Sequence, residues 1–271
     1  MSSLNDQLSK LGLRVRNWDR GDKIFALDIV GDSFFIQEGE GNQVHIQASD
    51  KKLGQAVLMV HELPREFELT IPKNAVGPRD RVIKELKYNR VLIARTTPDE
   101  TRHILVGRDE RGHPFATQLR GPSISVKQAH ESLKPEAIQG QRVGGKGKNY
   151  KKRGKKTGIK RQGEWFFTPV DQNTQRILNT QYWVNLIEKK VPIEPFHDGS
   201  SARAVGGKVR QRRGNPHTAD EVLVYTGGKE RVVYVRGAVR HAEHDTLKFN
   251  HWVKVDRNRE VVGSSAISWI D

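Results

Sequence analysis

The side chains best suited to chemistry gather in one short stretch, His241–Asp245, which reads HAEHD and carries two imidazoles and two carboxylates. Imidazoles three positions apart can meet on one side of a single turn. A third ring nitrogen could come from His217, in the preceding loop, or from His251. Such a group could hold a divalent metal ion or carry out acid-base chemistry on a phosphodiester.

Two hypotheses assign roles within this stretch. Acid-base catalysis would use His241 and His244, with Glu243 in support, whereas a metal site would take His241, His244 and His217 as ligands. Surface turns are also rich in these residue types for solvation alone, and the sequence favours that interpretation. No organic cofactor is predicted, a divalent metal is the one inorganic group the stretch could bind, and the sequence leaves open whether the protein is an enzyme.

The neighbouring elements place this stretch at the tip of a hairpin. Arg231–Arg240 and Leu247–Val255 are strongly strand-like, and Glu221–Tyr225 precedes them through a turn with two glycines. If alternate residues from 247 to 255 share one face, His251 is a hydrogen-bonded core residue and not a ligand.

Two arginines on the first of these strands could contact nucleic acid. Arg236 and Arg240 alternate with Tyr234, which predicts a cationic and aromatic face. Guanidinium groups pair with phosphates, and an aromatic ring can stack on an exposed base. The alternative is that both arginines pair with nearby acids such as Glu243 or Glu221.

Large aromatic residues mark a second candidate surface. The run Trp165-Phe166-Phe167 is expected to enter a core, with at most one ring facing outward. Trp252 shares a strand face with Lys248, Asn250 and Lys254, so it is the tryptophan best placed to meet a ligand.

Most of the positive charge is concentrated. Residues 139–163 contribute ten of the chain's net fifteen positive charges and contain no acid. Their glycine-rich, apolar-poor composition predicts a mobile basic linker. A second basic stretch, 199–214, extends the expected phosphate contacts. The basic side chains expected to neutralise phosphates in these stretches are Lys146, Lys148, Lys151, Lys152, Arg153, Lys155, Lys156, Lys160, Arg210, Arg212 and Arg213.

Alternating patterns and turn residues predict a predominantly antiparallel α+β fold. The expected strands include a hairpin within Lys23–Ile36, and the expected helices are Arg79–Tyr88 and one after a Ser125/Gln128 capping box. Ala266–Ile270 is expected to form an edge strand. The predicted organisation is an N-terminal β-rich domain over 1–138, the basic linker over 139–163, and a C-terminal β-rich domain over 164–271.

Several classes of protein are excluded by what the sequence lacks. There is no cysteine, which removes disulfides, thiol nucleophiles and cysteine-ligated metal clusters. No apolar stretch is long enough to span a bilayer and no signal-peptide core opens the chain, so a cytoplasmic location without membrane association is expected. The glycine spacings match no phosphate-cradling loop of a nucleotide-binding fold.

Four segments resemble a family of uncharacterised bacterial proteins that place similar segments in the same order. These are Leu105–Glu110 (LVGRDE), Ser132–Ala137 (SLKPEA), Arg161–Phe167 (RQGEWFF) and Val235–Leu247 (VRGAVRHAEHDTL). The resemblance carries over no activity. It implies that both halves form one functional unit and that the His241–His244 turn is part of a recurring segment.

The leading hypothesis is a nucleic-acid-binding protein, RNA favoured over DNA, that contacts backbone phosphates and works in a nucleoprotein complex with possible protein partners. One alternative is a histidine- or metal-dependent nuclease or phosphodiesterase. A second alternative is a scaffold subunit of a larger assembly.

Overall fold

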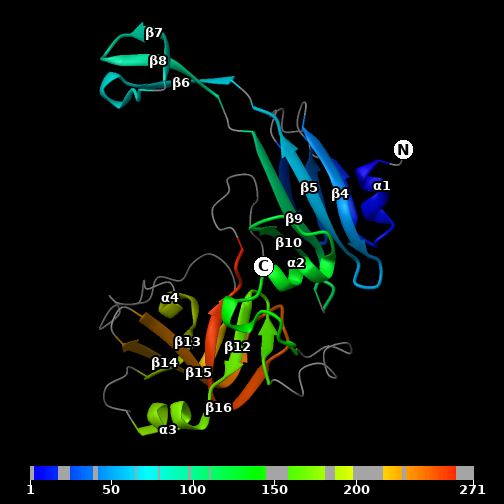
Figure 1. Cartoon of the computed structure of the whole chain (residues 1–271), viewed down its shortest axis with the longest axis vertical. Coiled ribbons are helices and arrows are strands. Elements are labelled where there is room, and N and C mark those ends of the chain that lie inside the picture. The colour runs from blue at the N-terminus through cyan, green and yellow to red at the C-terminus, as the bar shows by residue number, and fades with distance from the viewer. Residues whose placement is uncertain are drawn as a thin grey trace. The chain divides into compact units, whose positions relative to one another are not determined.

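The computed structural model describes residues 3–17, 25–38, 42–64, 66–78, 80–96, 99–109, 111–144, 158–180, 187–197, 216–227 and 230–260. Within these ranges the chain is mostly antiparallel β-sheet with few helices, which confirms the expected β-rich α+β class (Figure 1). Contacts divide the described residues into two compact units. The first lies within Met1–Gly107 and Ala116–Val126, and the second within Arg108–Phe115 and Lys127–Val261.

The elements before residue 126 form three small sheets, in the strand orders β1-β3-β2, β10-β9-β5-β4 and β6-β8-β7. The expected hairpin within Lys23–Ile36 is confirmed as β2 and β3, which turn at Gly31 with φ +59°. Strands β1 and β3 pair in parallel. The bounds are α1 Leu4–Ser9, β1 Arg14–Asn17, β2 Ala26–Val30, β3 Ser33–Gln37, β4 Gln43–Asp50, β5 Gln55–Glu62, β6 Glu66–Pro72, η1 Lys73–Ala75, β7 Arg81–Leu86, β8 Arg90–Thr96, β9 Glu100–Arg108 and β10 Pro114–Leu119.

The helix predicted over Arg79–Tyr88 is wrong, because this segment forms strand β7. It pairs antiparallel with β8, and the register shifts between Val82 and Lys84. That irregularity interrupts the two-residue alternation of a strand, which is why the apolar positions imitate helical spacing. All six residues of β7 are exposed, so strand pairing and not burial holds the segment.

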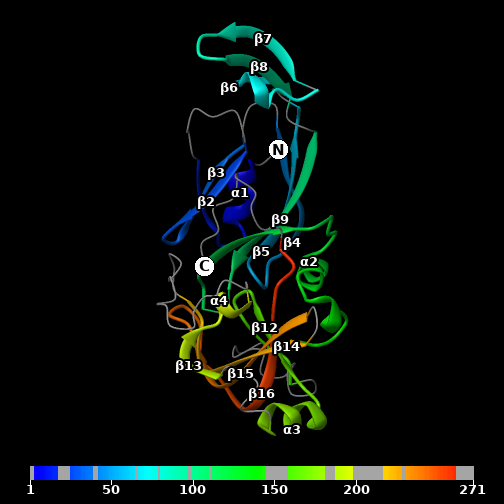
Figure 2. The ribbon, with the colours of Figure 1, turned by 90° about the vertical axis from the view of Figure 1, so that its left-hand side faces the viewer.

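The second unit is built around one six-stranded sheet, in the order β11-β12-β16-β15-β14-β13 (Figure 2). The sequence prediction missed α3, α4 and β13. The bounds are α2 Val126–Ser132, η2 Glu136–Ile138, β11 Lys160–Gln162, β12 Trp165–Pro169, α3 Gln172–Thr180, β13 Ile187–Pro192, α4 Glu194–His197, β14 Thr218–Gly227, β15 Glu230–Arg240 and β16 Leu247–Arg257.

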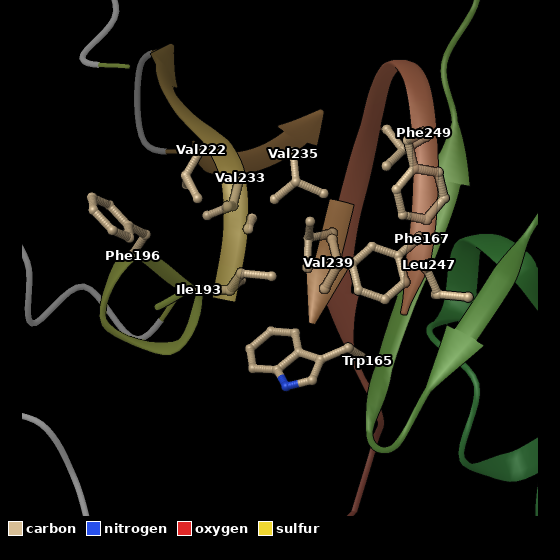
Figure 3. Close-up of a cluster of buried hydrophobic side chains, with 13 residues drawn as sticks. Trp165, Phe167, Ile193, Phe196, Val222, Val233, Val235, Val239, Leu247 and Phe249 are labelled. Carbon is tan, nitrogen blue, oxygen red and sulfur yellow. The ribbon is translucent and has the colours of Figure 1, made fainter. Parts of the chain in front are cut away.

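The core of this unit fills one face of the six-stranded sheet. Trp165, Phe167 and Phe196 pack there with a set of valines from β14, β15 and β16 (Figure 3). Phe166 points the other way, into a second cluster with Ile138 and Ile159. All three aromatic residues of the 165–167 run are therefore buried, which confirms the core interpretation.

The sheet is strongly curved. Phe167 pairs with Val255 near the end of β16, yet its ring lies 5.2 Å from that of Phe249 near the beginning of the same strand. A register shift between Val235 and Gly237 accompanies this bend, and Gly237 has φ +86°. Bulges bend strands and increase their twist, so this irregularity helps the sheet wrap around its core.

The far face of β16 is covered by α3, and this corrects the expectation for Trp252. Its side chain is fully buried with Leu178, Leu223 and Tyr234, and its Nε1 donates to Asn179 Oδ1 at 3.1 Å. Trp252 does lie on the strand face that the alternating pattern predicted. The helix that covers this face was not predicted. Trp252 is therefore a core residue.

None of the helices among the described residues is long and apolar enough to cross a bilayer. The edge strand expected at Ala266–Ile270 lies outside the described residues.

Candidate functional site

Three histidines from two separate segments meet in the second unit. His217 precedes β14, while His241 and His244 lie in the turn between β15 and β16, and their exposed fractions are 2%, 9% and 8%. The ring centroids of His217 and His241 are 4.3 Å apart, and those of His241 and His244 are 4.8 Å apart. The interpretation of this turn as solvated surface is therefore wrong, because its imidazoles are buried.

The strand register explains this meeting. Thr218 of β14 pairs with Arg240 of β15 in an antiparallel ladder. His217 comes one residue before the first partner and His241 one residue after the second, so they continue the ladder and lie opposite each other. Their rings stack with an angle of 18° between planes.

A half-buried carboxylate holds His217 in place. Glu194, at the start of α4, accepts the backbone N–H of His217 at 2.8 Å, and the same oxygen lies 3.2 Å from Nδ1 of the ring. Burial, the largest effect, raises the pKa of Glu194, but the hydrogen bonds from the His217 side chain and backbone together outweigh it. The pKa of Glu194 is therefore below its ordinary value, and the group is a carboxylate at neutral pH.

A second carboxylate, that of Asp109, lies beside His244 at ion-pair distance. One of its oxygens lies 3.6 Å from His244 Nδ1, and the other accepts the backbone N–H groups of Arg111 and His113 at 2.8 and 2.9 Å. Nothing in the sequence indicated that residue 109 would meet residue 244, since only folding brings the two segments together.

The turn between β11 and β12 closes over the histidines. Gly163 has φ +55°, and a Cβ placed on it would be 2.9 Å from His244 Nε2 and 3.5 Å from His217 Nε2. Gln162 Nε2 donates to the backbone oxygen of Asp245 at 2.6 Å, which ties this turn to the histidine turn. The two Nε2 atoms therefore face the same glycine.

Two groups of side chains could each hold a metal ion. Ligand atoms of His217, His241 and His244 lie within 4.8 Å of one another, and so do those of His217, Glu194 and Glu164. Glu164 was not considered from the sequence, where it reads only as the start of an aromatic run.

The other predicted site residues do not join either group among the described residues. The backbone N–H of Glu243 donates to His241 Nδ1 at 3.2 Å, but its carboxylate belongs to neither group. His251 is exposed on β16, so it is neither a ligand nor the core residue that strict alternation would make it. It lies where the register between β15 and β16 shifts, between the pairs Val235–Val253 and Gly237–Phe249.

The two arginines of β15 lie in ion pairs. Arg236 Nε donates to Glu221 at 2.5 Å, and its guanidinium lies 4.5 Å from the centre of the Trp252 ring. Arg240 pairs with Asp220 at 2.5 Å, and this hydrogen bond is the main reason the pKa of Asp220 is lowered. These contacts match the structural alternative that the sequence left open.

Most of the basic residues expected to bind phosphate, from Lys146 to Lys156 and from Arg210 to Arg213, lie outside the described residues. Lys160 is described: its Nζ donates to the backbone oxygen of Lys248 at 2.9 Å and lies 4.6 Å from the centre of the Phe249 ring.

The site can therefore supply imidazole nitrogens with carboxylates behind them, which suits metal binding or proton transfer. Comparison of the chain with models of known protein families, with curated proteins and with solved structures finds no match.

Proposed function

We propose that this protein binds nucleic acid, with RNA favoured over DNA, mainly through backbone phosphates. One observation supports this more than any other: the ends of each basic stretch come together within the second unit. Gly144 and Lys160, which flank residues 145–157, form a bridge. Ile193 and His217, which flank the second stretch, are joined by a backbone hydrogen bond of 2.9 Å. Both stretches thus start and end on one folded unit.

The chemistry of these stretches favours a polyanion. Lysine and arginine without neighbouring acids attract phosphates, and neutralising phosphates releases counterions from the nucleic acid. If about five side chains do so, the logarithm of affinity falls with the logarithm of salt concentration with a slope near −4. Binding is expected to track the backbone, and sequence-specific contact with bases is not part of the proposal.

The test compares two sets of five lysine-to-serine changes in the full chain. One set replaces Lys148, Lys151, Lys152, Lys155 and Lys156, and leaves Gly144 and Lys160 in place. The control set replaces five exposed lysines of the first unit, with the same change in net charge: Lys10, Lys51, Lys52, Lys84 and Lys87.

Affinity for a single-stranded RNA and a duplex DNA is measured across a range of salt concentrations. The first set should weaken binding and flatten the salt slope, because it removes the phosphate contacts. The control set should change both far less. An unaltered slope in the first set overturns the proposal, and equal effects in both sets would show that net charge alone governs binding.

A second candidate function is phosphodiester cleavage. It is favoured by the burial of three imidazoles in the unit that also holds the ends of both basic stretches. His241 and His244 would transfer protons or bind a metal. Replacing both with alanine should abolish cleavage of a labelled RNA and leave binding nearly intact. The His251→Ala protein, changed at an exposed residue, should cleave normally.

The scaffold alternative would instead show weak binding by the isolated protein and specific copurifying partners.

A further inference from the structure

We propose that His217, His241 and His244 form a binding site for one divalent transition-metal ion of the Zn²⁺ class. Their ligand atoms lie within 4.8 Å of one another, and all three side chains are buried. Neutral imidazole is a preferred ligand of such ions. This inference does not depend on nucleic-acid binding, because the site is defined by folded residues alone.

His217 is prepared to be a ligand. Its Nδ1 lies against the Glu194 carboxylate, which fixes the proton on that nitrogen and leaves the lone pair on Nε2. That Nε2 atom is buried and has no hydrogen-bond partner among the described residues. A buried polar atom without a partner is costly, and a metal ion would satisfy it. A carboxylate behind a ligating histidine is also the usual arrangement at metal sites.

His244 has a looser form of this arrangement, with a carboxylate at ion-pair distance instead of hydrogen-bond distance. Its Nδ1 faces Asp109 at 3.6 Å, and its Nε2 faces Gly163 together with the Nε2 of His217. A side chain at residue 163 would clash with these nitrogens, so the glycine lets both approach the same place. Two histidines from different segments therefore direct Nε2 toward one place, each with a carboxylate on the opposite ring nitrogen.

Of the three histidines, His241 is the least well prepared to bind a metal ion. Its Nδ1 accepts the backbone N–H of Glu243 at 3.2 Å, which places the ring proton of the neutral form on Nε2. Coordination through either nitrogen requires this hydrogen bond to break. We therefore expect His241 to contribute less to affinity than His217 or His244.

Metal binding also requires the three rings to close in. Nitrogen ligands on a tetrahedral Zn²⁺ lie roughly 3.4 Å apart, given bond lengths of about 2.0–2.1 Å, and the present separations reach up to 4.8 Å. Rotation of the near-parallel rings about their side-chain bonds can bring the ligand nitrogens close enough together. Three protein ligands leave a fourth position open, as in catalytic zinc sites, and a carboxylate oxygen of Glu164 lies within 4.8 Å of a ring nitrogen of His217.

The experiment titrates chelator-treated full-length protein with Zn²⁺ by calorimetry and with Co²⁺ by visible absorption. The wild-type chain should bind one equivalent and show the intense Co²⁺ bands of four- or five-coordination. It should also unfold at a higher temperature with metal than without, because the ion binds only the folded state. A wild-type titration without a one-to-one phase overturns the proposal, whatever the variants do.

Variants then test the ligand set. His217→Ala and His244→Ala should lose the one-to-one phase, His241→Ala should weaken it less, and His251→Ala should leave it unchanged. Glu194→Gln should keep the stoichiometry and weaken binding by about 10–100-fold. Circular dichroism checks that each variant folds. If a folded His217→Ala/His244→Ala protein binds the metal ion with wild-type affinity, the assignment of ligands is contradicted. Failure of the wild-type titration or of the variant titrations does not affect the RNA-binding measurement, which is a separate result.

Discussion

Glu194 and His217 are joined twice: one carboxylate oxygen of Glu194 accepts the backbone N–H of His217 at 2.8 Å and lies 3.2 Å from its ring Nδ1. The two residues come from the two ends of a basic stretch that lies outside the described residues. This pair therefore fastens the ends of that stretch and sets the orientation of a histidine at the candidate site.

The first prediction concerns acid stability. The pKa of Glu194 is lowered in the folded protein, so its contribution to stability is present above the ordinary value of 4.5 and is lost as pH falls through the lowered value. At neutral pH, Glu194→Gln should reduce the free energy of unfolding by about 1–2 kcal/mol, because it weakens charge-assisted hydrogen bonds. Urea denaturation from pH 7 to pH 3 should show this difference shrinking toward zero.

The control for this prediction is Glu243→Gln, whose carboxylate joins neither potential metal-binding group of the described residues. It should leave the free energy of unfolding at pH 7 close to the wild-type value. A constant difference between wild type and Glu194→Gln at every pH would contradict the lowered pKa.

The second prediction concerns the bulge that bends β15. Gly237 has φ +86°, and a Cβ there would lie 2.6 Å from Asp220 Cβ. Gly237→Ala should therefore destabilise the protein by about 2–4 kcal/mol, through backbone strain and overpacking. Gly121→Ala should change stability little, since no atom lies within 4 Å of its added Cβ. Thermal unfolding of the two variants measures this difference in stability. Similar melting temperatures would contradict the prediction.

The third prediction compares two fully buried tryptophans. Trp252 Nε1 donates to Asn179 Oδ1, whereas Trp165 Nε1 has no hydrogen-bond partner among the described residues. Tryptophan-to-phenylalanine changes remove similar volumes, but only Trp252→Phe removes a hydrogen bond. Its partner is not stranded, because Asn179 is exposed and its Oδ1 also accepts from Arg236 Nη1 at 3.1 Å. We expect Trp252→Phe to cost about 0.5–1.5 kcal/mol more than Trp165→Phe in denaturant unfolding. The reverse order would show that the indole of Trp165 has a partner elsewhere.

The fourth prediction separates stability from binding at Arg236. Its ion pair with Glu221 and its contact with the Trp252 ring are lost in Arg236→Ala, which should cost about 1–3 kcal/mol. Affinity for RNA should stay near the wild-type value, because the guanidinium is already engaged. Arg176→Ala, on the exposed side of α3, is the control and should change stability by less than about 0.5 kcal/mol. A large loss of RNA affinity in a stable Arg236→Ala protein would restore Arg236 as a phosphate contact.

Local patterns found most strands of this fold but not every element. Alternation and turn glycines located β2, β3, β14, β15 and β16, because each carries buried apolar residues between turn signals. The pattern failed at β7, where a bulge broke the period, and α3 was missed although it covers Trp252. A bulge or a covering helix depends on contacts with distant segments, which no local window contains.

The sequence by itself determined the β-rich class, the concentration of positive charge, and the pairing of His241 with His244 across one turn, because composition and short spacings are properties of neighbouring residues. Only the tertiary structure decided that this turn is buried, that His217 continues the same ladder, and that Glu194 and Asp109 face the imidazoles. These relationships join residues far apart in the chain, and the strand register and sheet curvature that bring them together are set by the packing of the whole unit.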